Sequence, residues 1–229
     1  MTKSMMAKLH SYGITDGMVT STVITIILIV LALLAGRNMK MIPGRFQSAF
    51  EIVVEKLYGF FEGIMGKKLA RENFAFLGTF FIYILLSNYS GLLPASGHLP
   101  GVMAPTVSLN CTAAPAIVVF FMTQVVGIRA NRGPKYYLHL FRPFAFLFPL
   151  LAIEMFVRPL SLSMRLYGNV FGEEQAVHQF FGLCPIGVPV IMQFLSVLMG
   201  LVQALVFSLL TCIYFMEAAE VEGEELPVV

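Results

Sequence analysis

The chain has 229 residues, of which 58% are hydrophobic and 12% are charged, and its formal net charge is +2. A soluble domain carries about a quarter charged residues, so this chain has too little polar surface to cover a globule in water. A lipid bilayer accepts such a composition, and we therefore expect a membrane protein.

The basic residues and the cysteines form no binding motif. The basic residues flank apolar segments without a separate cluster, so we expect no nucleic acid partner. The three cysteines, Cys111, Cys184 and Cys212, lack the spacing of metal ligands and are interpreted as packing residues. The sequence contains no nucleotide-binding loop and no catalytic constellation, so we expect no metal, no cofactor and no catalytic residue.

Five apolar segments are long enough to cross a bilayer, which requires about 20 mostly apolar residues. They are 18–35, 74–93, 111–128, 144–181 and 187–216. The first is not followed by a cleavage site, so we expect it to be retained as a span. The sequence predicts an all-α membrane protein with residues 1–229 in one domain, whose last two helices are long and tilted as a hairpin.

Residues 45–64 predict a different kind of helix. Apolar side chains recur there at helical spacing, and charged side chains occupy the other positions. Such a helix fits the membrane interface, with one face in lipid and one in water. The alternative is a helix packed on a soluble domain, but the position between two spans favours the interface.

Lysine and arginine predict the orientation, because cytoplasmic connections carry an excess of both. They are frequent between the first and second spans and between the third and fourth spans, whereas the connections after the second and fourth spans have none. The amino terminus is therefore expected outside and the acidic tail 217–229 in the cytoplasm. Lys3 and Lys8, on the outer side, disagree with this pattern.

The fourth span contains the charged stretch RPLSLSMRLYGNVFGEE at 158–174. An arginine at the bilayer centre costs about 2.5–3.5 kcal/mol on insertion scales, so these charges must face protein or water. The alternative is a surface helix that does not cross the membrane. The nearly uncharged runs on either side, 144–153 and 177–183, favour the span.

Helical geometry places most polar side chains of this stretch on one stripe, about 60° wide. The stripe holds Glu154, Arg158, Arg165 and Asn169. Glu173 lies at its edge, and Glu174 lies roughly opposite Arg165. Carboxylates on both sides of a central cation suggest two aqueous half-paths that do not meet. Arginine cannot lose its proton in a protein, so Arg165 is expected to block direct leakage.

The last span carries Gln203, with Ser196 and Gly200 on nearly the same helical face. A glutamine in an apolar helix needs hydrogen-bond partners. Arg165 is one candidate if the last two spans form a hairpin. The alternative is that Gln203 only joins one helix to another.

These motifs resemble subunit a of F-type ATP synthases, nearest its chloroplast and cyanobacterial branch. The resemblance covers RPLSLSMRLYGN followed by VFGEE, NYSGLLP at 88–94, PTVSLNCT at 105–112 and GLVQALVFSLLTCIYF at 200–215. These motifs occur in the order found in that family and extend over about residues 45–217.

The resemblance implies a role for each polar residue. Arg165 matches the arginine that faces the ring of c subunits. Glu174 matches the carboxylate of the outer half-channel, and Glu173 matches the position beside it. Asn169 and Gln203 match polar residues beside the arginine, and Glu154 matches an acidic position toward the inner exit. Ser108 stands where the family usually has an acidic residue. Asn110 is therefore expected to serve the outer vestibule without that carboxylate.

The resemblance implies a stator subunit that carries protons or Na⁺ past the c ring, with ATP chemistry left to other subunits. The expected partners are the c ring, b-type peripheral stalk subunits and membrane lipid. The expected location is a bacterial plasma membrane, in preference to a thylakoid. A secondary ion-coupled transporter is the alternative, although such transporters are commonly built from inverted repeats and none is evident here.

Overall fold

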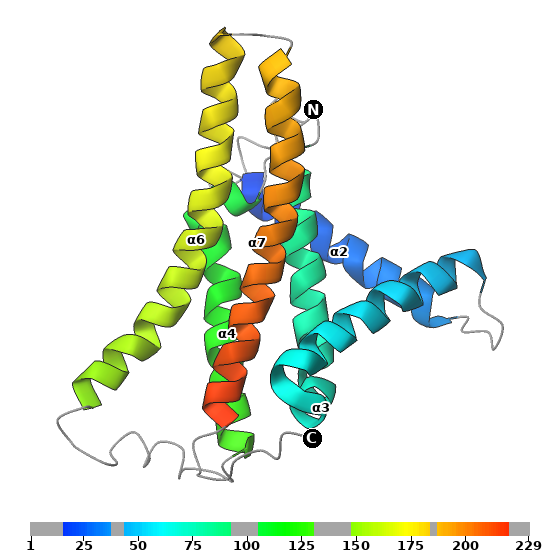
Figure 1. Ribbon diagram of the computed structural model, residues 1–229, viewed down its shortest axis with the longest axis vertical. Helices are drawn as coiled ribbons and strands as arrows, with labels where there is room; N and C mark the ends of the chain where they lie inside the picture. The colour runs from blue at the N-terminus through cyan, green and yellow to red at the C-terminus, as the bar shows by residue number, and fades with distance from the viewer. Residues whose placement is uncertain (1–15, 38–43, 93–104, 131–147, 184–186, 220–229) are drawn as a thin grey trace.

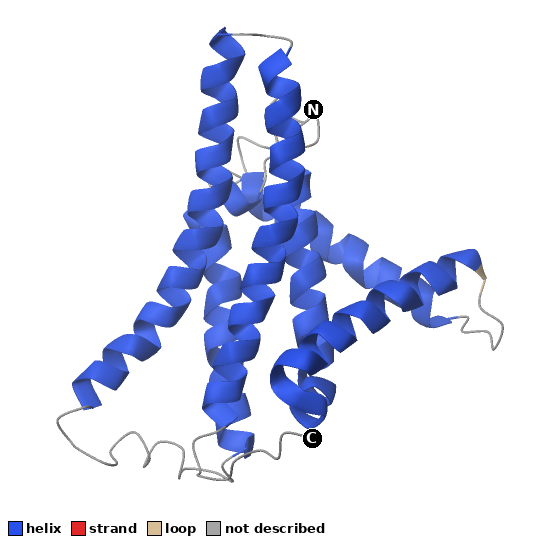
Figure 2. Cartoon of the chain, viewed as in Figure 1, coloured by secondary structure: helices blue, strands red, loops and turns tan. Residues whose placement is uncertain are grey.

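The structure is a computed structural model that describes residues 16–37, 44–92, 105–130, 148–183 and 187–219. The regular elements within these ranges are all helices, as Figure 2 shows. In chain order they are α2 (Asp16–Arg37), α3 (Arg45–Ser90), the 3₁₀ turn η1 (Pro105–Val107), α4 (Leu109–Ala130), α6 (Phe148–Leu183) and α7 (Gly187–Ala219). The prediction of an all-helical chain is confirmed for this part of the protein.

Three stretches of helix are long and apolar enough to cross a membrane. They are Phe50–Ser90, Leu109–Ala130 and Ile191–Ala219. The apolar run in α2 is shorter, Gly17–Leu33, and α6, which carries the charged stretch, is not in this group. The chain therefore has several membrane-crossing helices, while the count of five stays a prediction.

Helix α3 joins two predicted elements into one bent helix. The sequence predicted an interfacial helix ending at residue 64 and a span beginning at residue 74; in the structure the two helical arms meet directly at Gly66, without a connecting loop. The helix bends at Gly66, whose φ of 76° and ψ of 161° are accessible to glycine because it lacks a Cβ atom. In Figure 1 the first arm leads away from the bundle, and the second arm runs alongside α7.

Aromatic packing holds the bend in α3. Tyr58 and Phe61, in the first arm, lie against Phe74 in the second, with ring centroids 5.3 and 6.2 Å apart. Phe61 and the neighbouring Met65 are almost fully buried. The angle between the arms is therefore fixed by side-chain contacts as well as by the glycine.

Helix α7 is the centre of the bundle and packs against α3, α4 and α6 (Figure 1). Phe207 and Phe215 of α7 are fully buried and lie 6.4 Å from Phe80 and 5.9 Å from Phe76, measured between ring centroids. Leu162 of α6 belongs to the same core. Burying each large apolar side chain contributes about 1.5–3 kcal/mol in water, but in lipid this shape-specific packing matters more than burial itself.

The end of α3 is joined to the first half of α7 by polar contacts. The Asn88 amide donates to the carbonyl of Gly200 at 3.2 Å, and the Tyr89 hydroxyl donates to the carbonyl of Val197 at 3.2 Å. A Cβ atom at Gly200 would lie 3.1 Å from the Tyr89 ring, which is closer than an ordinary van der Waals contact, so a larger residue would require the ring to shift. These contacts fix the position of α7 along its axis relative to α3.

Candidate polar site between two helices

The predicted stripe lies on α6 and faces α7 in part. Asn169 donates from Nδ2 to Oε1 of Gln203 at 2.6 Å. Gln203 is 3% exposed, and its Nε2 atom has no hydrogen-bond partner among the described residues. Gln203 is therefore joined to α6 through Asn169, and no hydrogen bond between described residues joins it to Arg165.

Arg165 is exposed and stands apart from these contacts. In the described part of the chain, no hydrogen bond or ion pair engages its guanidinium. Three of its neighbours on the helix surface, Ser161, Gly168 and Gly172, are small and also exposed. A Cβ atom on either glycine would meet nothing within 4 Å. Arg165 therefore lies on an open strip where another helix could approach closely.

The other exposed face of α6 is apolar. Phe156, Leu160 and Met164 are 68%, 62% and 51% exposed, whereas Leu162 and Leu166 on the opposite face are each 1% exposed. An isolated protein in water does not leave such a face uncovered, so lipid or another protein must cover it. The open strip with Arg165 borders this face.

A second charged cluster lies seven residues before Arg165. Arg158 forms an ion pair with Glu154 at 2.6 Å and a second ion pair with Glu217 of α7. Its Cζ atom lies 5.3 Å from the centroid of the Tyr214 ring. The predicted stripe contained Arg158 and Glu154, but the partners of Arg158 on α7 were missed because they are far away in the sequence.

The predicted outer residues are only partly described. Glu173 is half-buried on α6, while the side chain of Glu174 lies outside the described residues. Asn110 is exposed in the first turn of α4. The Ser108 carbonyl accepts hydrogen bonds from the backbone N–H groups of Cys111 and Thr112 at 3.0 and 3.1 Å, so this residue stands at the N-cap position just before α4. No hydrogen bond between described residues joins Ser108 or Asn110 to α6.

The cysteines and the other possible metal ligands lie apart in the described residues. Within them, no group of three or more His, Cys, Asp or Glu side chains could hold a metal ion. Cys212 is buried in the core and Cys111 is partly buried, both as free thiols, while Cys184 lies outside the described ranges.

Comparison with known proteins identifies the family. The family model described as ATP synthase A chain matches residues 18–216. The chain belongs to the ATP synthase subunit a family. An ATP synthase subunit a from Moorella thermoacetica is 41% identical over 85% of this chain and 88% of its own length. Similar proteins from Pelobacter propionicus and Geobacter sulfurreducens are 38% and 36% identical, over 95% and 90% of this chain and 94% and 88% of their own lengths.

Membership of the subunit a family makes this chain a subunit of the membrane sector of an ATP synthase, with a function in ion transport and ATP synthesis. The match spans the bundle and every polar residue of α6. It ends one residue before Glu217, the partner of Arg158 on α7. The expected nearness to the chloroplast branch stays a prediction.

Proposed function

We propose that this chain is the stator of a rotary ATP synthase and supplies two proton half-channels to a ring of c subunits, separated by Arg165. The observation that carries the proposal is the exposed Arg165, unpaired among the described residues, on an open strip of small side chains. A structural arginine in a membrane would be paired within its own chain, as Arg158 is.

The energetic argument concerns the counter-charge of Arg165, which none of the described residues provides. An unpaired arginine at the bilayer centre costs about 2.5–3.5 kcal/mol on insertion scales. A rotor carboxylate opposite Arg165 would offset this cost, since an opposite charge within about 4–6 Å favours the ionised carboxylate. Each rotor site would thus release its proton on reaching Arg165 and take up another beyond it. Because the guanidinium keeps its own proton, it would block direct flow between the half-channels.

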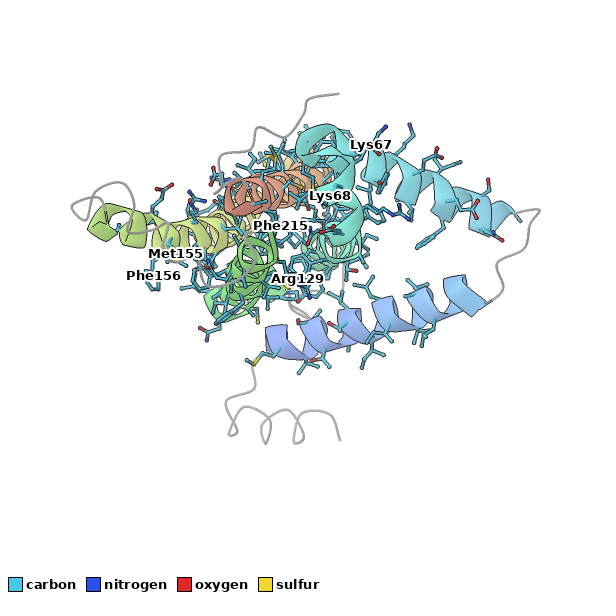
Figure 3. All side chains as sticks on the ribbon, turned by 90° about the horizontal axis from the view of Figure 1, so that it is seen from below. Lys67, Lys68, Arg129, Met155, Phe156 and Phe215 are labelled. Atoms are coloured by element: carbon cyan, nitrogen blue, oxygen red, sulfur yellow. The ribbon has the colours of Figure 1, made fainter. Side chains whose placement is uncertain are left out.

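The proposed paths lie on opposite sides of Arg165 along α6. The outer path runs past Glu173 and Glu174, and the inner path ends near Glu154, at the end of the bundle that carries the Arg158 ion pairs. Figure 3, viewed from below, labels Lys67, Lys68 and Arg129 at this same end. Basic residues favour the cytoplasmic side, which supports an inward orientation for this end.

The remaining features of the proposal follow from this orientation. We propose five crossings, with α2 and α6 added to the three apolar stretches and α6 paired with α7 as a tilted hairpin. The first arm of α3 would lie along the membrane interface, consistent with its exposed Phe50, Ile52 and Val53 and its interspersed charges. The transported ion would be H⁺ or Na⁺. The proposed partners are the c ring, b-type stalk subunits and lipid in a bacterial plasma membrane.

A photo-cross-linking experiment tests which face of the chain meets the rotor. Gly168→Cys would be made in the complete enzyme after the three native cysteines are replaced by alanine, and labelled with benzophenone maleimide. Ile117→Cys on α4, where the native side chain is 51% exposed, is the matched control. Illumination should join residue 168, but not residue 117, to a c subunit. Equal yields at both positions, or none at residue 168, would contradict the proposal.

A further inference from the structure

Two polar cross-links join α6 to α7, and Arg165 lies between their positions on α6. The first is the hydrogen bond from Asn169 to Gln203 at 2.6 Å. The second is the ion pair of Arg158 with Glu217. The residue numbers rise along α6 and fall along α7 from one cross-link to the other, so the two helices run antiparallel (Figure 1).

The spacing of the cross-links fixes one register. Arg158 and Asn169 are about 16 Å apart along α6, and Gln203 and Glu217 are about 21 Å apart along α7, at 1.5 Å per residue. The long side chains of Arg158 and Glu217 take up the difference. A slide of one helix by a turn, about 5.4 Å, would separate both pairs at once.

Arg158 is the residue that makes the second cross-link possible. Its side chain is 30% exposed and lies between two carboxylates that are 52% and 47% exposed, those of Glu154 and Glu217. Without the guanidinium, two like charges would meet at the helix ends and repel each other. The side chains just before Arg158 bury little surface, since Ile153 and Phe156 are 60% and 68% exposed.

We propose that Arg158 is a positioning residue, which bridges Glu154 and Glu217 and so holds α6 and α7 in the register that presents Arg165 to the rotor. This inference rests on the proposed function of Arg165. It assigns Glu217 a structural partnership and no part in carrying protons.

A charge-swap experiment in the complete enzyme tests this role. The variants are Arg158→Gln, Glu217→Gln, the double variant with both changes, and the swap Arg158→Glu with Glu217→Arg. Each single change should lower ATP-driven proton pumping several-fold, and the double variant should lose no more than either single one. The swap should recover most of the pumping, because an arginine at 217 again has two carboxylates beside it. An arginine cannot carry protons, so recovery also excludes a proton-carrying role for Glu217.

Two further readouts separate this inference from others. Passive proton leak in all four variants should stay well below that of Arg165→Ala, because the permanent charge of Arg165 is still present. The thermal stability of the purified membrane sector should show the same non-additive pattern as pumping. Additive losses of pumping or stability in the double variant would contradict the proposed ion-pair bridge. A swap variant that pumps no better than the single variants would contradict it too.

The failure of this inference can be told apart from failure of the proposed function. If Glu217→Gln pumps normally while Arg165→Ala does not, the positioning role is wrong and the proposed function stands. If Arg165→Ala pumps normally, the proposed function is wrong. A non-additive stability pattern would then retain the Arg158 bridge only as a structural contact, and the positioning role would fall with the proposed function.

Discussion

Two arginines on the same stripe of α6 have opposite surroundings. Arg158 forms ion pairs with Glu154 and Glu217 and lies over the Tyr214 ring. Arg165, two turns further along, is exposed and has no ion pair within the described residues. The fold therefore neutralises Arg158 within the chain. It leaves Arg165 exposed on the surface, where a partner could reach it.

The largest expected effect comes from the open arginine. Arg165→Ala should abolish ATP-driven proton pumping in vesicles, because the rotor carboxylates lose their counter-charge. Arg165→Lys should fail too, since lysine lacks the planar five-donor fork and can lose its proton when buried. Arg129→Ala is the control, because Arg129 is an exposed arginine at the end of α4. Pumping by Arg165→Ala at the rate of the control would remove the distinction between the two arginines of α6.

A smaller effect is expected on the outer side of Arg165. Glu174→Gln should slow proton-driven ATP synthesis several-fold without loss of assembly, because an amide cannot carry a proton to the rotor. Synthesis rates and the amount of assembled enzyme would be measured together. Normal synthesis would remove Glu174 from the path and leave Glu173, half-buried on α6, as the candidate.

The smallest expected effect concerns the position of α7 along its axis, because the surroundings of both arginines on α6 depend on where α7 lies. Gly200→Ala should destabilise the bundle by about 1–3 kcal/mol, because the added methyl group would overpack the contact with α3. The new Cβ atom would lie 3.1 Å from the Tyr89 ring and 3.3 Å from Asn88 Cβ. Gly59→Ala is the matched control, since its Cβ atom would meet nothing within 4 Å. Thermal unfolding that is equally affected by both substitutions would show that the contact does not set the position of α7.

Helical periodicity predicted which residues share one face of a helix better than it predicted the contacts between helices. It put Arg158, Arg165 and Asn169 on one stripe, because 100° per residue applies within any α-helix. It could not give the register of α6 against α7, so it offered Arg165 as a partner for Gln203 where the structure has Asn169.

Local sequence patterns also could not predict the bend of α3 or the ion pair of Glu217 with Arg158. The bend depends on a single positive φ at Gly66, one of 19 glycines in the chain. Glu217 was visible only as the first charge after the last apolar run, 59 residues from its partner Arg158. Contacts at such separations are set by tertiary packing, which periodicity in one segment does not contain.

The most direct test of the central claim is passive proton conductance through the membrane sector, measured in vesicles without ATP and with the rotor ring in place. Removing Arg165 should open a leak, because rotor carboxylates could then exchange protons across the gap between the half-channels. We predict that Arg165→Ala vesicles dissipate an imposed pH gradient several-fold faster than wild-type vesicles, while vesicles with the exposed-arginine control Arg129→Ala hold it like the wild type. Arg165→Ala vesicles as tight as the wild type, or Arg129→Ala vesicles with an equal leak, would contradict the role of Arg165 as the barrier.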